Sequence, residues 1–142
     1  MQDKYEGLKL EKQLCFPLYA CSRMVIKKYN PLLSGLDLTY TQYIALLVLW
    51  EERSLSVKEL GRKLFLDSGT LTPLLKSMEA KGLVRRFRSS EDERVLIAEI
   101  TDEGMAMRDK AADIPEKVGS CIKLEPNEAI ELYRILYKLL DE

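Results

Sequence analysis

Apolar residues recur at helical spacing in the middle of the chain. Four of them stand at positions i, i+3, i+4 and i+7, which predicts one apolar stripe of a helix: Leu71, Leu74, Leu75 and Met78. The opposite face carries small or hydrogen-bonding side chains and a single cation: Gly69, Thr70, Thr72, Pro73, Lys76, Ser77 and Ala80. A face built only for solubility carries Glu and Lys along its length more often. This face is slim and polar enough to enter the major groove of DNA, which is about 12 Å wide.

Two β-type runs follow this helix. Gly82 is predicted to end the helix, and the runs Val84–Arg88 and Arg94–Ile100 then flank a polar tip at residues 89–93. The hairpin holds four arginines: Arg85, Arg86, Arg88 and Arg94. A helix followed by an arginine-bearing hairpin is the layout of a winged helix-turn-helix.

The first helical pattern covers residues 8–29 and contains Pro17. An interior proline removes a backbone hydrogen bond, so either the helix bends near Cys15 or its regular part begins around Pro17. Asn30-Pro31 is predicted to end this helix, and residues 31–38 are predicted to connect it to the next element.

Capping signals divide residues 39–66. Thr39-x-x-Gln42 is a capping box that predicts a helix ending near residue 52, and Ser56-x-x-Glu59 is a second box that opens a short helix. Leu55-Ser56 between them can add one short strand beside the hairpin, and Phe65-Leu66 makes the next turn.

Pro73 complicates the start of the polar-faced helix. A cap at Thr70 leaves the proline in the first turn, whereas a cap at Asp67 implies a kink. We therefore expect this helix to start late or to bend.

Helical patterns also fill the C-terminal part. Thr101 or Asp102 is predicted to cap a long helix that runs to about Ile114, and Pro126 fits the first position of a last helix. The apolar stripes at the two ends of the chain exceed what a small core can bury alone. The predicted fold class is mainly α (α+β): a winged helix-turn-helix at residues 39–104, with residues 1–38 and 105–142 forming a dimerisation layer.

Charge is unevenly distributed along the 142 residues. The formal net charge is −1, but residues 53–94 hold ten Lys/Arg and six Asp/Glu, a net +4, and the remainder carries −5. A basic middle between acidic ends is suited to one DNA-facing surface. Since the sequence has no apolar run of 18 residues and no secretory leader, we expect a cytoplasmic protein without a membrane partner.

The chain has three cysteines and no histidine. Cys15, Cys21 and Cys121 do not suggest a disulfide framework in a cytosolic protein, and their spacing matches no zinc pattern. The absence of histidine removes Ser-His-Asp, Cys-His and His-metal chemistry together. We expect no metal, no cofactor and no enzymatic activity.

The spacing Asp92-x-Arg94-(x6)-Thr101-x-x-Gly104 resembles that of the MarR (multiple antibiotic resistance regulator) family of dimeric winged-helix regulators. The resemblance implies that Asp92 orients Arg94 into the minor groove, where concentrated negative potential attracts arginine. The candidate DNA contacts are Ser68, Thr70, Thr72, Lys76, Arg86, Arg88, Asp92 and Arg94.

A second resemblance rests on residues 14–20, on Tyr29 and Tyr40, and on the run Leu66–Pro73. These look like the organic hydroperoxide resistance regulators (OhrR) of the same family, in which one cysteine near the start of the first helix is oxidised. The resemblance implies that Cys15 is the reactive thiol and that Tyr29 and Tyr40 hydrogen-bond its sulfur. Tyr19 is a further candidate partner of the thiol.

The same resemblance implies that Cys121 is the resolving cysteine of a two-cysteine type, forming an intersubunit disulfide with Cys15. Cys21 lies six residues from Cys15, about 240° around a helix and roughly 9 Å along it, which exceeds disulfide reach. We expect Cys21 to be a small core residue.

The sequence thus predicts a homodimeric repressor that binds double-stranded operator DNA and releases it when organic hydroperoxide oxidises Cys15. One alternative is a repressor released by a reversible aromatic or phenolic ligand. Two others are a thiol peroxidase on a winged-helix scaffold and a winged-helix module that binds proteins.

Overall fold

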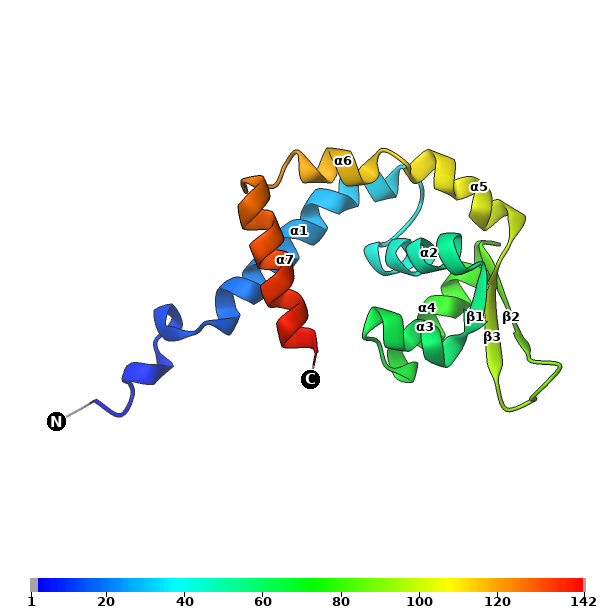
Figure 1. Ribbon diagram of the computed structural model, residues 1–142, viewed down its shortest axis with the longest axis horizontal. Helices are drawn as coiled ribbons and strands as arrows, with labels where there is room; N and C mark the ends of the chain where they lie inside the picture. Colours follow the sequence, from blue (N-terminus) through cyan, green and yellow to red (C-terminus); the bar gives the residue numbers. More distant parts are fainter. Residues whose placement is uncertain (1–2, 142) are drawn as a thin grey trace. The chain divides into compact units, whose positions relative to one another are not determined.

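The computed structural model describes residues 3–141, and the chain divides between Ala112 and Asp113 into two compact units. The first unit contains η1 (Glu6–Leu8), η2 (Leu10–Lys12), α1 (Cys15–Ser34), α2 (Tyr40–Glu52), β1 (Ser54–Ser56), α3 (Val57–Leu64), α4 (Ser68–Ala80), β2 (Val84–Arg88), β3 (Leu96–Ile100) and α5 (Asp102–Ala111). The second unit contains α6 (Ile114–Gly119) and α7 (Pro126–Leu140). These elements, labelled in Figure 1, make a mainly helical protein with one small sheet, which confirms the predicted class.

The strands form an antiparallel sheet in the order β1-β3-β2. Leu55 of β1 pairs with Ala98 of β3, which confirms the predicted short strand beside the hairpin. β3 begins at Leu96, two residues later than predicted. The reason is that the Val95 N–H donates to the Asp92 carbonyl at 2.9 Å, so this part of the chain closes the hairpin tip.

The core of the first unit lies among α2, α3, α4 and the sheet. Its largest fully buried side chains are Leu33, Leu46, Leu49, Leu60, Leu71, Leu75 and Met78. The predicted apolar stripe of α4 is therefore confirmed as the buried face of that helix.

Helix α1 begins at Cys15, which places Pro17 in the first turn. A proline there removes no helical hydrogen bond, because the first four N–H groups of a helix have no intrahelical partner. This confirms that the regular helix begins near Pro17.

The predicted end of this helix at Asn30-Pro31 is wrong, since α1 continues to Ser34. Pro31 removes one backbone bond, but the turn after it carries Leu33, which is 0% exposed. The Leu33 carbonyl also accepts from two N–H groups of the following turn, those of Leu36 and Leu38, both at 3.0 Å. Burial and these bonds outweigh the local effect of the proline.

Of the two starts considered for α4, the structure has the earlier one, so the late start at Thr70 is wrong. Asp67 is the N-cap, and its Oδ1 accepts from the Thr70 N–H at 2.8 Å. Pro73 consequently lies inside the helix, where its missing N–H leaves one carbonyl without its usual donor. The other end is as predicted: Gly82 has φ +75°, and the Leu83 N–H donates to the Met78 carbonyl at 3.0 Å.

The hydroxyl of Thr101 caps α5 by accepting from the Gly104 N–H at 3.0 Å. The helix ends at Ala111, three residues earlier than predicted, and the chain resumes as the separate helix α6. The Trp50 indole N–H donates to the Gly104 carbonyl at 2.8 Å. The start of α5 is thereby fixed against α2.

In the second unit, Pro115 occupies the first turn of α6, and Pro126 is the first residue of α7, as predicted. Glu125 accepts from the Glu128 N–H and donates its own N–H to the Glu128 carboxylate, which forms a capping box. Within residues 3–141, no helix is long and apolar enough to cross a membrane.

Candidate functional site

The exposed face of α4 carries the four predicted contact residues, Ser68, Thr70, Thr72 and Lys76. Thr72 donates its hydroxyl to the Ser68 carbonyl at 2.9 Å, which still leaves the oxygen free to accept. Ser77, which the wheel places on the same face, is instead half-buried and bonded within the protein. The available polar surface is therefore the N-terminal part of α4.

The β2–β3 hairpin extends away from the helices of the first unit (Figure 1). Near its tip, the Asp92 carboxylate accepts from the Arg94 backbone N–H at 3.1 Å, from Nε at 3.1 Å and from Nη2 at 3.2 Å. The side-chain hydrogen bond from Arg94 keeps the pKa of Asp92 below its usual value. The Arg94 side chain is nevertheless 90% exposed, so the guanidinium is oriented while remaining accessible.

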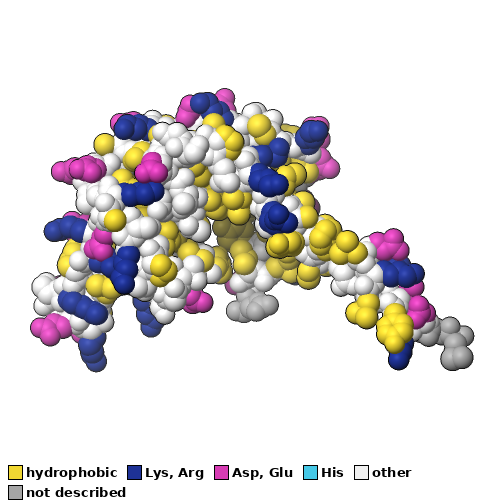
Figure 2. All heavy atoms as spheres, turned by 180° about the vertical axis from the view of Figure 1, so that it is seen from behind, with side chains coloured by type: hydrophobic (Ala, Val, Ile, Leu, Met, Phe, Trp, Pro, Cys, Tyr) yellow, Lys and Arg dark blue, Asp and Glu magenta, His cyan; other side chains and the backbone are white. Residues whose placement is uncertain are grey.

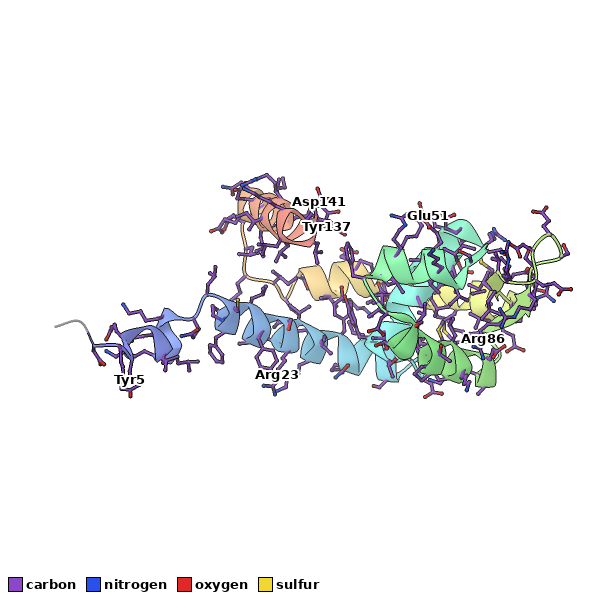
Figure 3. All side chains as sticks on the ribbon, turned by 90° about the horizontal axis from the view of Figure 1, so that it is seen from below. Tyr5, Arg23, Glu51, Arg86, Tyr137 and Asp141 are labelled. Carbon is purple, nitrogen blue, oxygen red and sulfur yellow. The ribbon has the colours of Figure 1, made fainter. Side chains whose placement is uncertain are left out.

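The predicted DNA contact Arg86 has a partner inside the protein. Its Nε and Nη2 donate to Glu79 Oε1 at 3.0 and 2.8 Å, and its backbone N–H donates to Oε2 at 3.2 Å. The Arg86 side chain is 17% exposed (Figure 3 labels it), and its hydrogen bonds lower the pKa of Glu79. The pair ties β2 to the C-terminal half of α4, and Arg86 would have to leave it to contact DNA.

The other arginines of the hairpin differ in their surroundings. Arg85 forms an ion pair with Glu99 at 2.9 Å and lies 5.0 Å from the ring centroid of Phe87. Arg88 is exposed. Of the predicted wing residues, Arg88 and Arg94 therefore offer the most accessible charge.

We expect substitution of Arg86 by alanine to destabilise the protein without changing the salt dependence of DNA binding. The melting temperature should fall on the order of 3 °C, because the bond between α4 and the wing is lost. The slope of log affinity against log salt should stay at the wild-type value, since a side chain held by Glu79 releases no counterion. Arg88→Ala is the matched control, and its slope should decrease by about one for each Arg88 side chain that contacts a phosphate. If the slope of Arg86→Ala decreases by the same amount, Arg86 does contact DNA.

The three cysteines are free and exposed. Cys15 is the first residue of α1, where unpaired backbone N–H groups favour negative charge. Cys121 follows α6, and its thiol donates to the Lys117 carbonyl at 3.4 Å. Cys21 is exposed on α1, so the prediction that it is a core residue is wrong for the single chain.

Tyr29 and Tyr40 lie side by side, with ring centroids 4.9 Å apart, and Tyr43 lies 5.7 Å from Tyr29. Burial raises the pKa of Tyr40, and its neighbour Tyr29 raises that pKa further. The Tyr40 hydroxyl therefore stays protonated and can donate a hydrogen bond.

The same-chain Cys15 is not the partner of these phenols. Tyr29 lies fourteen residues after Cys15 in one continuous helix, which corresponds to about 21 Å along the axis. Tyr19 is one turn from Cys15 and is exposed, with the Arg23 guanidinium 5.5 Å from its ring (Figure 3). The single chain thus brings the two phenols together, but away from its own thiol.

Large apolar side chains are exposed in both units. In the first unit they lie on the N-terminal segment and the start of α1, where Figure 2 shows hydrophobic atoms at the surface: Leu8, Leu10, Leu14, Phe16 and Leu18. In the second unit they lie on α7: Ile130, Tyr133, Tyr137, Leu139 and Leu140. Apolar surface on this scale marks a place where another molecule docks. The described part of the chain groups no three His, Cys, Asp or Glu residues that could hold a metal ion.

Comparison with known proteins gives sequence matches both to a family pattern and to individual proteins. The pattern of the family described as "Transcriptional regulator SarA/Rot" matches residues 27–111. The organic hydroperoxide resistance transcriptional regulator of Bacillus subtilis is 49% identical over 141 residues, which cover 99% of this chain and 96% of that protein.

Solved structures show the same arrangement of elements. Reduced AbfR bound to DNA is 37% identical, with a TM-score of 0.80 over 98% of this chain and 95% of that one. Disulfide-formed AbfR is 39% identical, with a TM-score of 0.67 over 96% of both chains. A cysteine-to-serine mutant of Escherichia coli MarR in complex with operator DNA is 25% identical, with a TM-score of 0.78 over 98% and 99% of the two chains.

Proposed function

This chain belongs to the MarR family of winged helix-turn-helix transcriptional regulators, in its organic hydroperoxide resistance branch, and from that premise we propose that it is a homodimeric repressor released from its operator by organic hydroperoxides. The observation that most supports the proposal is the exposed Cys15 thiol at the first residue of α1. It gives a peroxide direct access to a cysteine sulfur, whose thiolate form is the nucleophile.

DNA binding would use two elements of each subunit. The N-terminal part of α4 would enter the major groove with Ser68, Thr70, Thr72 and Lys76, which are all exposed. Two such helices in a dimer would enter successive grooves about 34 Å apart. Each wing would place Arg94, oriented by Asp92, in a flanking minor groove, with Arg88 near the backbone.

Dimerisation would bury the apolar side chains that each chain exposes on its N-terminal segment, α1 and α7. Residues 1–38 and 105–142 would form this layer, and residues 39–104 would form the DNA-binding domain. The separation of about 21 Å along α1 also supports an intersubunit sensor, in which Cys15 of one subunit meets Tyr29 and Tyr40 of the other.

The redox step begins with attack of the Cys15 thiolate on the terminal, hydrogen-bearing oxygen of the hydroperoxide. The O–O bond breaks, and the departing alkoxide takes a proton and leaves as an alcohol, so that the sulfur becomes a sulfenic acid. The Cys121 thiol of the partner subunit would then attack this sulfur and release water, forming a disulfide between subunits. Sulfur is oxidised by two electrons, and the peroxide is reduced by two.

The function is tested by fluorescence anisotropy on DNA from the protein's own promoter. Reduced protein should bind, an equivalent of organic hydroperoxide per subunit should release it, and a thiol reductant should restore binding. A thiol peroxidase would consume many equivalents rapidly in the presence of reductant, whereas a sensor consumes about one. Binding that is indifferent to peroxide would contradict the proposal and would direct the search to a reversible ligand.

We expect Arg94→Ala to weaken operator binding by about ten- to a hundredfold, because each dimer loses two minor-groove cations. The melting temperature should not change, since the side chain is 90% exposed and its partner Asp92 is at the surface. Glu93→Ala, at the exposed neighbouring position, is the control. Affinity equal to that of the wild type would remove Arg94 from the contacts.

A further inference from the structure

Gln42 is the single polar or charged side chain that is buried within residues 3–141, with 3% of it exposed. Burying an amide is costly unless its donors and acceptor are bonded. Here both ends are bonded, and they reach two different elements. The Gln42 side chain therefore joins parts of the fold instead of only filling the core.

The nitrogen end of Gln42 reaches the DNA-reading helix. Nε2 donates to Ser77 Oγ of α4 at 2.9 Å, and Ser77 Oγ in turn donates to the Leu74 carbonyl at 2.7 Å. The hydroxyl of Ser77 is thus fixed by one bond to its own helix and one bond to α2.

The oxygen end of Gln42 reaches the junction between α1 and α2. Oε1 accepts from the Thr39 N–H at 3.1 Å and from Lys81 Nζ, just beyond the end of α4, at 3.0 Å. Lys81 also donates to the carbonyl of Asp37, a residue with φ +56° in the turn that joins the two helices. The amide and the ammonium together connect this junction to α4 at two points.

One of the two phenols proposed to contact the sensor thiol, Tyr40, is on the same turn of α2 as Gln42. Tyr40 lies two residues before Gln42, about 200° around the helix, so the two side chains leave α2 on opposite faces. Tyr40 packs on Tyr29 of α1 at 4.9 Å. The first turn of α2 therefore has Tyr40, packed on Tyr29 of α1, on one side and the bonded amide on the other.

We propose that Gln42 is the positioning residue through which the tyrosine end of α2 sets the position of α4. The inference rests on the proposed function, because it assumes that oxidation of Cys15 displaces the tyrosines. Apolar contacts between α2 and α4 allow the helices to slide, since they have no preferred direction. A buried hydrogen bond has a fixed length and direction, so α4 follows the first turn of α2 or loses the bond.

The test compares Ser77→Ala with Thr39→Ala in the full-length dimer. Ser77→Ala removes the bond between the helices and keeps the capping box of α2. Thr39→Ala is the matched control, because it removes the hydroxyl that caps the same turn and leaves the Gln42–Ser77 bond in place. The measured quantity is the ratio of operator dissociation constants of peroxide-treated and reduced protein, with Cys15 sulfenic acid quantified by a dimedone label.

In Ser77→Ala we expect this ratio to fall about five- to tenfold relative to the wild type, with sulfenic acid formed at the wild-type rate. In Thr39→Ala we expect a lower melting temperature and a wild-type ratio. A purely structural role of Ser77 would change both dissociation constants by the same factor and leave their ratio unchanged.

Gln42→Met removes the same bond from the other side and should lower the ratio too. Gln42→Glu should restore it, because the Ser77 hydroxyl can turn from the Leu74 carbonyl to donate to the carboxylate, which also accepts from Lys81.

Three outcomes would overturn the inference. If peroxide releases the wild type, and Ser77→Ala and Gln42→Met have the wild-type ratio of dissociation constants, Gln42 has no positioning role, whereas the proposed function stands. An equal fall in Thr39→Ala shows that any weakening of α2 suffices. Slower sulfenic acid formation in Ser77→Ala shows an effect on sensing and not on transmission. If the wild type itself is not released, the proposed function fails first, and the inference fails with it.

Discussion

Replacing Cys15 with serine should leave operator binding intact and abolish release by organic hydroperoxide. Serine keeps the size of the side chain and its position at the first residue of α1. Its hydroxyl is not ionised at neutral pH and does not attack the O–O bond, so the first step of the switch is removed. We expect full DNA occupancy at peroxide concentrations that release the wild type completely.

The other two cysteines provide matched controls on the same protein. Cys21→Ser changes another exposed thiol on the same helix and should respond to peroxide like the wild type. Cys121→Ser should form the Cys15 sulfenic acid but no disulfide-linked dimer on a non-reducing gel. Each variant is titrated by fluorescence anisotropy with the same promoter DNA, before and after peroxide.

Release of the Cys15→Ser variant from DNA by peroxide would contradict the thiol mechanism. Loss of the peroxide response in Cys21→Ser would assign a sensing role to Cys21, six residues further along α1. A disulfide-linked dimer in Cys121→Ser would show that Cys121 is not the resolving residue. These outcomes are separable because each assigns the chemistry to a different sulfur.

Local signals in the sequence predicted the elements whose causes are local. Thr39-x-x-Gln42 predicted the start of α2 because a capping box closes within one turn. Gly82 predicted the end of α4, where the chain needs a positive φ, and Pro126 predicted the first residue of α7. In each case the deciding atoms lie within a few residues of one another.

The effects of the two prolines Pro31 and Pro73 were predicted less well, for different reasons. α1 continues through Pro31 because complete burial of Leu33 offsets a missing backbone bond. For α4 the sequence left two caps open, and the side chain of Asp67, the earlier one, caps the helix ahead of Pro73. A proline rule gives the local cost in both cases, but it does not include the stabilisation by the core or the cap.

The same distinction applies to the candidate site. The orientation of Arg94 by Asp92 was predictable, because the two residues are neighbours in one turn. The partners of Arg86 and Ser77 were not predictable, because each lies on another element. Glu79 of α4 accepts from Arg86 of β2, and Gln42 of α2 donates to Ser77 of α4. Ser77 and Arg86, which a helical wheel and a hairpin diagram place at the surface, therefore form hydrogen bonds that attach α4 to its neighbouring elements.

Gly104→Ala should unfold the protein or lower its melting temperature on the order of 10 °C, because this position has no room for a methyl group. A Cβ at Gly104 would lie 2.3 Å from the Leu83 carbonyl oxygen and 2.6 Å from Ile100 Cγ1. The carbonyl cannot retreat easily, since it accepts from both the N–H and the hydroxyl of Thr101 at 3.0 Å. The Trp50 bond to the Gly104 carbonyl fixes the opposite side.

Gly119→Ala is the matched control, because Gly119 is also helical but has nothing within 4 Å of an added Cβ. Its melting temperature should stay the same or rise slightly, since alanine has the lower conformational entropy in the unfolded chain. Differential scanning calorimetry of both variants separates the steric effect from the general effect of replacing a helical glycine. Equal stability of the two variants would contradict the argument. A fall confined to Gly104→Ala would explain in steric terms why the spacing Asp92-x-Arg94-(x6)-Thr101-x-x-Gly104 ends in glycine: the wing and α5 meet there at backbone distance.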